Sequence, residues 1–402
     1  MERPLQLLSG REQQLVNRDK PLLWTAIFSS MFSAQMILPV IGLYAAVELG
    51  ADALTVGTIY GTSALTAFVL RIPAAMLSHR IGTRRIMVFG MAASSAGSVL
   101  YGFAAEPLQM IVGSLLRGLG SAFFFPAALT SLYEEAGNGE GDPKSLGYML
   151  TGPALGMALG PVFGAASLSL LGYRPTFYTA AAISLVGLAT ISATKIHMPN
   201  ERAPSFKSLL EKRFTSLLAS RFLVNYVTGT IAAFLPLMAK LLLGYDEPVV
   251  LLLFTTAAFT NLFSRVFMGT AAKKLGAQNY VALGSLTVSL SSLMFALGHD
   301  FSVWLGALVY GLGMGIFVLG SVYMTGLLVP PAMRTMGFAL ITLMIDMGNS
   351  VGNFVSGVLL SLGGFAEVFA VAAVVGAAGL FVDLISRRWP LPYEKRSQSS
   401  AE

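Results

Sequence analysis

Twelve mostly apolar runs, each about 20 residues long, follow one another along this chain and limit its fold more than any other feature. Their centres lie near residues 35, 65, 95, 120, 158, 184, 230, 257, 288, 316, 350 and 375. A helix of about 20 residues crosses the hydrocarbon core of a bilayer. Only 11% of the residues are charged, whereas soluble domains carry roughly 25%. We therefore predict an all-α integral membrane protein with twelve transmembrane helices.

The distribution of the basic residues predicts the orientation in the membrane. Most of the 26 lysines and arginines fall in the N-terminal tail, the central segment 195–214, the C-terminal tail and alternate loops. The other loops hold mainly acids such as Glu48, Asp300 and Glu367. By the positive-inside rule, both termini are expected in the cytoplasm, with the chain in the cytoplasmic (inner) cell membrane. Because topology accounts for the net charge of +6, nucleic acid is not expected as a partner.

The two halves of the chain repeat each other. "RIPAAMLSHRIG" at residues 71–82 resembles "RVFMGTAAKKLG" at residues 265–276, and "RGLGSAFF" from Arg117 resembles "YGLGMGIF" from Tyr310. A nearly constant spacing also relates two pairs of glycines, Gly152 with Gly348 and Gly156 with Gly352. Parallel six-span repeats are typical of one large class of secondary transporters. We predict an N-terminal six-helix bundle (1–194), a cytoplasmic linker (195–214) and a C-terminal six-helix bundle (215–402).

Several classes of chemistry are disfavoured by residues that the chain lacks. It has no cysteine, and its three histidines lie far apart at span ends, so neither a disulfide nor a metal site is expected. The nucleotide-binding pattern G-x-x-x-x-G-K-[ST] is absent, and the glycines of "GLGMGIF" lie inside an apolar run with no strand before them. We therefore expect neither an enzyme nor a resident cofactor.

A basic motif between the second and third spans resembles that of a known transporter family. The chain reads "AMLSHRIGTRR" at residues 75–85, close to the pattern G-x-L-a-D-r-x-G-r-r of the major facilitator superfamily. The matching positions are Leu77, Arg80, Gly82, Arg84 and Arg85. Ala75 replaces the first glycine, and His79 stands where the family has aspartate. The resemblance covers nearly the whole chain and implies two pseudo-symmetric six-helix bundles. In that family the acid helps to lock the cytoplasmic gate, so histidine implies an altered, weaker or pH-dependent lock.

Glycine and proline recur in the fifth span, which reads "GPALGMALGPVFG" at residues 152–164. In a water-soluble helix each interior glycine costs about 1 kcal/mol, and each proline about 3 kcal/mol, relative to alanine. In a membrane, neighbouring helices can satisfy the backbone groups that proline frees. The run resembles the signature g-x-x-x-G-P-x-x-G-G, which within the superfamily is characteristic of antiporters that export drugs or metabolites against protons. Close packing of small residues is the alternative interpretation. The hinge and packing residues, expected to face the opposite half, are Gly152, Gly156, Gly160, Pro161 and Gly164.

Two ionisable residues fall inside the spans, where charge is costly and a function is the first hypothesis. Asp346 lies about nine residues into the eleventh span, ~14 Å deep at about 1.5 Å per residue, and we expect it to carry the coupling proton. A structural aspartate bonded to a neighbouring helix is the alternative. Arg117 lies at a similar depth in the fourth span, where it could adjust the protonation of a carboxylate, pair with Asp346 or bind an anionic substrate. A fixed pairing to backbone carbonyls at a helix break is the alternative for Arg117.

In the family, the first, fourth, seventh and tenth helices line the central path. Polar residues of these spans and of the eleventh are therefore the cavity candidates: Gln35, Ser33, Ser121, Asn225, Tyr226, Tyr310, Asn349 and Asn353. Arg221 of the seventh span is a further cavity candidate, although an anchor at the cytoplasmic end of its helix is the interpretation that we favour for it. The conformational gate is expected to include Arg71, His79, Arg80, Gly82, Arg84 and Arg265. Most other acids and bases lie at span ends and are expected to be solvated.

The leading hypothesis is a proton-coupled exporter of small amphipathic molecules that works by alternating access. An uptake symporter or facilitator for a metabolite is the alternative, and a non-transporting membrane receptor is a third hypothesis. We expect a monomer in the lipid bilayer, with a small molecule as substrate and H⁺ or Na⁺ as the coupling ion.

Overall fold

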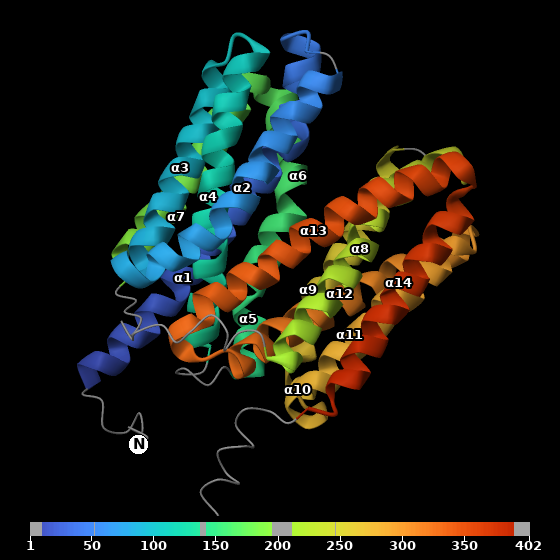
Figure 1. Cartoon of the computed structure of the whole chain (residues 1–402). Helices are drawn as coiled ribbons and strands as arrows, with labels where there is room; N and C mark the ends of the chain where they lie inside the picture. The colour runs from blue at the N-terminus through green and yellow to red at the C-terminus, as the bar shows by residue number, and fades with distance from the viewer. Residues whose placement is uncertain (1–9, 52, 137–141, 195–210, 246, 390–402) are drawn as a thin grey trace, which may run out of the picture. The chain divides into compact units, whose positions relative to one another are not determined.

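A computed structural model describes residues 10–51, 53–136, 142–194, 211–245 and 247–389, and every regular element in them is helical (Figure 1). The chain begins with α1 (Gly10–Leu43), the π-helical turn η2 (Tyr44–Glu48), α2 (Ala53–Ile81), α3 (Thr83–Phe103), α4 (Pro107–Glu135), α5 (Pro143–Met149), α6 (Thr151–Leu171) and α7 (Tyr173–Ala193). It continues with α8 (Lys212–Leu241), α9 (Glu247–Phe267), α10 (Gly269–Leu275), α11 (Ala277–Ala296), α12 (Asp300–Leu328), the 3₁₀ turn η4 (Pro331–Met333), α13 (Arg334–Leu362) and α14 (Phe365–Ser386). Most of the expected linker lies outside the described residues.

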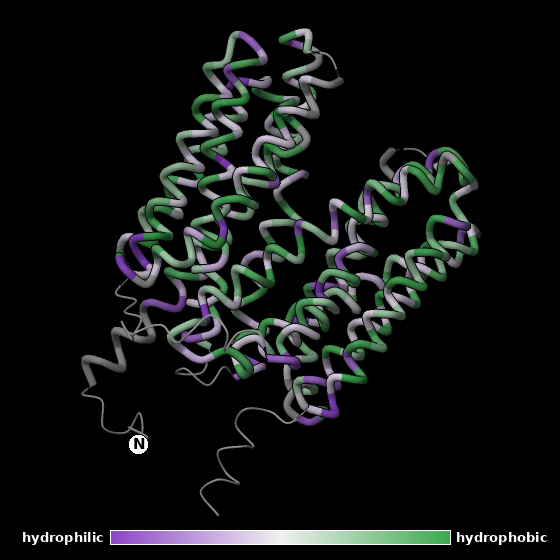
Figure 2. The backbone as a smooth tube through the Cα atoms, viewed as in Figure 1, coloured by the Kyte–Doolittle hydropathy of each residue, from purple (hydrophilic) through white to green (hydrophobic). Residues whose placement is uncertain are grey.

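The long helices have the length and composition that a bilayer requires. Within the described residues, eleven helices are long and apolar enough to cross a membrane. The twelfth expected span is α9, whose apolar part, Leu252–Phe267, is shorter. Figure 2 shows hydrophobic residues along the lengths of the helices and hydrophilic residues gathered towards their ends. Each predicted span centre lies in a different long helix, so the predicted all-α membrane fold is confirmed.

Contacts divide the chain into two compact units. The first unit holds Met1–Glu135 with Gly152–Arg202, and the second holds Ala136–Thr151 with Ala203–Glu402. The short helix α5 therefore groups with the second unit, whereas the boundaries expected from the sequence place it in the first half. A buried hydrogen bond shows why: Arg265 Nη1 of α9 donates to the Leu150 carbonyl at the end of α5, at 2.8 Å.

The two units use the same pattern of helix packing. In the first unit, α4 packs on α2 and α3, and α7 packs on α1 and α3. In the second, α12 packs on α9 and α11, and α14 packs on α8 and α11. These are equivalent neighbours in the same chain order. The sequence repeat is therefore also a repeat of three-dimensional packing.

Two glycines at the ends of the repeated motifs have the backbone conformation that only glycine adopts without strain. Gly82 joins α2 to α3 with a φ of 91°, and Gly276 joins α10 to α11 with a φ of 78°. A β-carbon is unfavourable at such positive φ values. The glycine that closes each motif thus permits the sharp connection between consecutive helices.

Candidate functional site

The glycines of the fifth span let α6 pack directly on α1 of the same unit. A β-carbon at Gly156 would lie 2.6 Å from Met31 Cβ and 2.8 Å from the Phe32 amide nitrogen. One at Gly160 would lie 2.6 Å from Gln35 Cβ. The expectation that this face meets the opposite half is therefore wrong, because α1 covers it. Sequence spacing identifies which small residues share a face, but not which helix packs there.

The second unit repeats this contact between its own first and fifth long helices. A β-carbon at Gly348 of α13 would lie 2.9 Å from Asn225 Cβ of α8, and Gly352 lies against the Tyr226 carbonyl. The remaining packing residues predicted in α6 are Gly152 beside Trp24, Gly164 beside Met36, and the exposed Pro161. The glycine pairs noticed in the sequence thus serve the same packing role in each unit.

Arg221 lies on α8 in the interior of the second unit, with 4% of its surface exposed. Its Nη1 donates to Ser321 Oγ of α12 at 2.6 Å, and its guanidinium lies 5.2 Å from the centre of the Phe317 ring. The Nε atom is buried and has no hydrogen-bond partner among the described residues. The favoured interpretation, an anchor at the end of the helix, is therefore wrong, because α12 covers the side chain, and the cavity interpretation remains. Arg221 is a buried cation that keeps an unpaired donor.

Two asparagines extend this polar interior, which we define as Arg221, Ser321, Asn225 and Asn349. Asn225 Nδ2 donates to the Arg221 carbonyl one turn earlier in α8, at 2.7 Å. Asn349 of α13 packs against α8 at Gly229, and its Oδ1 is buried without a hydrogen-bond partner among the described residues. Buried polar atoms almost always have a partner, which can be water or a ligand. Arg221 Nε and Asn349 Oδ1 are therefore a donor and an acceptor that a polar ligand could satisfy.

The other cavity candidates have varied surroundings. Ser33 Oγ donates to the Ala180 carbonyl at 2.7 Å, so this side chain joins α1 to α7. Tyr310 is partly buried on α12. Tyr226 is buried on α8, Gln35 and Ser121 are partly buried on α1 and α4, and Asn353 is exposed on α13. Ser33 is thus engaged in helix packing.

The two proposed coupling residues lie well inside their helices. Because α13 begins at Arg334, Asp346 lies about 18 Å along the helix at ~1.5 Å per residue, and its side chain is partly buried. Arg117 of α4 turns towards α3, where its Nη1 donates to Ser98 Oγ at 2.8 Å. The acceptor is a serine hydroxyl on α3 and not one of the backbone carbonyls that the alternative for Arg117 named. The coupling roles of both residues stay predictions.

The predicted gate residues occupy the ends of the motif helices. Arg71 is buried in α2, and Arg84 Nη2 donates to the Ser192 carbonyl, which ties α3 to α7. Arg80 is exposed, and the side chain of His79 lies outside the part of the chain that the structure describes. Arg84 and Arg265, which bonds to the end of α5, therefore brace neighbouring helices. Their role in gating stays a prediction.

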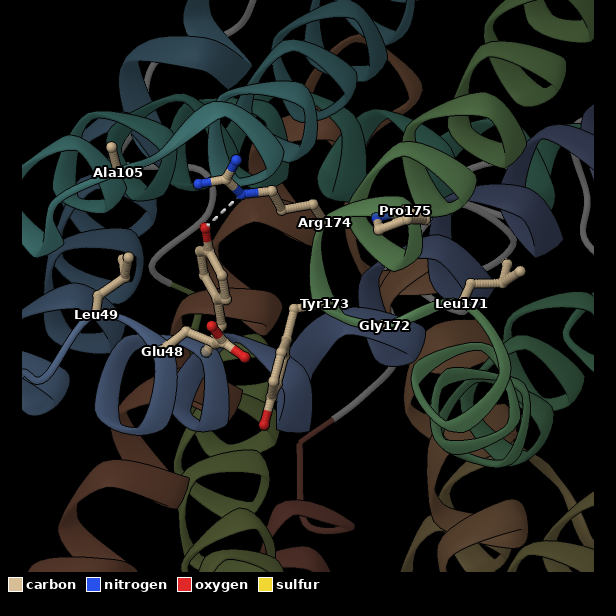
Figure 3. Close-up of a pocket in the computed structure, with 9 residues that line it drawn as sticks. Glu48, Leu49, Ala105, Leu171, Gly172, Tyr173, Arg174 and Pro175 are labelled. Atoms are coloured by element: carbon tan, nitrogen blue, oxygen red, sulfur yellow. Dashed lines mark hydrogen bonds between the residues drawn. The ribbon is translucent and has the colours of Figure 1, made fainter.

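A pocket of about 420 Å³ opens at one end of the first unit (Figure 3). The η2 turn, the α3–α4 connection and the α6–α7 junction line it, through Tyr44, Glu48, Leu49, Ala105, Leu171, Gly172, Tyr173, Arg174 and Pro175. The Tyr44 hydroxyl donates to the Ala104 carbonyl at 2.7 Å and accepts from Arg174 Nε at 3.1 Å. Glu48 and Arg174 are exposed at its rim. None of the predicted cavity residues lines this pocket, so it is separate from the polar interior.

Sequence reasoning missed a buried acid near the end of α14. Asp383 is only 3% exposed, so the expectation that acids at span ends are solvated is wrong for this residue. Its Oδ2 accepts hydrogen bonds from Ser220 Oγ of α8 at 2.9 Å and from Ser285 Oγ of α11 at 2.6 Å. The feature that could have indicated it is an acid inside the apolar run "FVDLIS". However, the length of an apolar run does not show whether the last turn of the helix is exposed to water or covered by other helices. No group of three His, Asp or Glu side chains that could hold a metal lies among the described residues.

Replacing Arg221 with methionine is expected to leave the fold stable and to reduce transport. The substitution keeps a long side chain over Phe317 and removes a charge that no described acid pairs with. Replacing buried ionic groups with apolar ones is often neutral or stabilising by about 1–4 kcal/mol. Thermal unfolding and vesicle transport are the measurements, with Arg388→Met, which removes an exposed arginine outside the predicted gate and cavity, as the control. Unchanged transport in Arg221→Met would show that the polar interior does not contribute to binding.

Comparisons with known proteins agree with this architecture. The profile of the Major Facilitator Superfamily matches residues 23–309 and 217–402. An uncharacterised MFS-type transporter of Methanocaldococcus jannaschii is 24% identical over 378 residues, which are 88% of this chain and 94% of that protein. The chromaffin granule amine transporter of Rattus norvegicus is 22% identical over 357 residues, covering 86% of this chain and 68% of that protein. The crystal structure of the human organic anion transporter MFSD10 matches with a TM-score of 0.78 at 13% identity, covering 92% of this chain and 99% of that one. The profile matches together extend over nearly the whole chain, which therefore belongs to the Major Facilitator Superfamily of transporters.

Proposed function

We propose that this transporter is proton-coupled and exports small amphipathic molecules by alternating access. The observation that carries the proposal is Asp346, an acid about 18 Å along a membrane helix at ~1.5 Å per residue. Ionisable groups at such depth are costly, and they mark ion pathways and proton relays in transporters. The glycine and proline signature of α6 resembles that of exporters and supports the direction. A relative named for amine transport supports a small organic substrate.

In the proposed cycle, Asp346 takes up a proton from the outer side and releases it into the cytoplasm, while substrate moves the opposite way. The unpaired donor of Arg221 and the unpaired acceptor of Asn349 supply hydrogen bonds to a polar group of the substrate. The cycle contains no covalent step, and H⁺, with Na⁺ as the alternative, is transported rather than held as a cofactor. The proposal also places both termini in the cytoplasm and takes the monomer as the working unit.

The test is transport by purified protein in liposomes with an imposed pH gradient. Tyramine and benzoate serve as probes, since they are a small amphipathic amine and a small amphipathic anion. In vesicles whose protein termini face the bath, an acidic lumen is expected to drive probe accumulation beyond that in protein-free liposomes. Protease treatment of the exposed tails determines the oriented fraction.

The other outcomes of this experiment each contradict the proposal in a different way. Accumulation only with the reversed gradient would indicate uptake symport, and gradient-independent equilibration would indicate a facilitator. Dependence on a sodium gradient alone would replace H⁺ by Na⁺. A probe that binds but never enters the lumen would indicate a receptor.

A further inference from the structure

The junction of α14, α8 and α11 in the second unit contains a carboxylate that the proposed cycle does not use. We define the Asp383 junction as Asp383, Ser220 and Ser285, whose two hydroxyl groups donate to Asp383 Oδ2 at 2.9 and 2.6 Å. Both serines are fully buried, and Asp383 is nearly so. No described residue forms an ion pair with this carboxylate. A buried carboxylate whose hydrogen-bond donors are all neutral is costly, so it calls for a functional explanation.

The first unit contains an equivalent junction, which reveals what the fold itself requires. A β-carbon at Gly187 of α7 would lie 3.1 Å from the Ala26 carbonyl of α1. A β-carbon at Gly379 of α14 would lie 3.8 Å from the Ser220 carbonyl of α8. These two glycines therefore occupy matching points of the repeated packing. One helical turn after them lie Ile191 and Asp383, respectively.

The equivalent junction is apolar throughout. The spacing that relates Gly82 to Gly276 also relates Ala26 to Ser220 and Met91 to Ser285. The residues that correspond to Asp383, Ser220 and Ser285 are thus Ile191, Ala26 and Met91. Ile191 and Ala26 are 0% exposed and Met91 is 1% exposed. Because the first unit closes this junction with apolar side chains, the acid of the second unit is not needed for packing.

The hydrogen bonds at the junction suit both protonation states of Asp383. A serine hydroxyl donates to a carboxylate, and after rotation of its hydrogen it can accept from a protonated carboxyl group. Proton binding therefore does not require a side chain to leave its site. It replaces one strong charge-assisted hydrogen bond with a weaker neutral one. The strength of the packing of α14 against α8 and α11 would therefore depend on whether Asp383 is protonated.

The charged groups near the junction keep their charge, so Asp383 is its titrating group. On α8, Arg213 donates to the Gln278 side chain of α11 and to the Trp389 carbonyl. Gln278 Nε2 in turn donates to the Asp383 carbonyl at 3.0 Å. On α14 itself, Arg387 follows one turn later and acts on Asp383 through its charge. Arginine stays protonated in proteins. These groups link the junction to the start of α8, the start of α11 and the end of α14.

We propose that Asp383 is a second proton-binding site of this transporter, which exchanges with the side of the membrane that holds the termini and sets the dependence of transport on the pH of that side. The proposal rests on the proposed transport function, but not on a coupling role for Asp346. Asp346 would carry the transported proton, whereas Asp383 would report cytoplasmic pH to the α8–α11–α14 packing.

The first test measures proton binding directly and needs no substrate. Infrared difference spectra of the purified protein are recorded between acidic and basic buffer, in the region of the protonated carboxyl band. Asp383→Asn is expected to lose one component of this band that Asp346→Asn retains. If Asp383→Asn shows the same band as the wild type, the proposal is wrong. This result is independent of whether either probe is transported.

The second test uses oriented vesicles in which only the pH on the terminus side is varied. A single titrating site changes its occupancy up to about tenfold per pH unit, and Asp383→Asn is expected to lose this dependence of the transport rate. The dependence on the pH of the opposite side should stay unchanged. An unaltered profile on the terminus side would overturn the proposal.

A control variant copies the junction of the first unit into the second. The triple substitution Ser220→Ala, Ser285→Met and Asp383→Ile replaces the polar side chains with the apolar set found at the equivalent position. It is expected to fold, to transport and to lack the terminus-side pH dependence, and it substitutes for Asp383→Asn should that variant fail to fold. A triple variant that keeps the wild-type profile would show that the dependence arises elsewhere.

Discussion

An Asp346→Asn variant is expected to lose proton-driven accumulation of substrate while retaining exchange of substrate for substrate. Asparagine has nearly the volume of aspartate and still forms hydrogen bonds, but it cannot bind and release a proton. A gradient of one pH unit stores about 1.4 kcal/mol per proton and permits up to about tenfold accumulation. The variant should reach equilibration only. Uptake of labelled probe into vesicles, with and without the gradient, measures both activities.

The control for this experiment neutralises an acid that lies elsewhere. Glu48 is exposed at the rim of the pocket in the first unit, so Glu48→Gln removes one negative charge from outside the proposed pathway. This variant should accumulate probe as the wild type does. Full gradient-driven accumulation by Asp346→Asn would show that the residue is a structural aspartate, and the coupling site would have to be sought at another acid.

A Gly156→Leu variant is expected to destabilise the first unit and to impair transport, while insertion into the membrane stays close to normal. Its β-carbon would lie 2.6 Å from Met31 Cβ, 2.8 Å from the Phe32 nitrogen and 2.9 Å from the Phe28 carbonyl. Two of these atoms belong to the backbone of α1 and cannot rotate away, so the two helices must separate. Overpacking of this kind costs about 1–3 kcal/mol, occasionally more. The thermal midpoint in detergent, the yield of membrane-inserted protein and vesicle transport are the measurements.

The matched control is Gly61→Leu in α2. No atom of another segment lies within 4 Å of the position that a β-carbon would take there, and the position is exposed, so the added side chain does not force two helices apart. It should leave the thermal midpoint and the transport rate close to those of the wild type. Equal stability of Gly156→Leu and Gly61→Leu would refute the proposed role of the α6 glycines in packing.

The sequence was sufficient to predict the helices and their repeat, because bilayer thickness sets the length of an apolar run. It also identified the residues on the glycine face of α6. It could not identify α1 as the helix that covers this face, since helical spacing describes one helix at a time. The burial of Asp383 could not be predicted for a related reason. Hydropathy registers an acid near the end of a run, but only the packing of α8 and α11 shows that it is buried.

The hydrogen-bond partners of Arg117 and Arg221 could not be predicted from the sequence for the same reason. Both arginines were recognised in the sequence, but their hydrogen-bond partners lie on other helices. Arg117 bonds to Ser98 of α3, and Arg221 bonds to Ser321 of α12. Long side chains can reach several neighbours, so the helix that bears the arginine does not determine where its charge lies. Three-dimensional packing decides that.

The contact between α6 and α1 also limits where compounds dissolved in the bilayer can enter the protein laterally. Backbone atoms of α1 lie where the β-carbons of α6 would be, so this seam is too narrow for a methyl group. Gly348 and Gly352 close the seam between α13 and α8 in the same way. A substrate that partitions into the bilayer is therefore barred from both seams, and lateral entry, where it occurs, must use the wider spaces beside other helices.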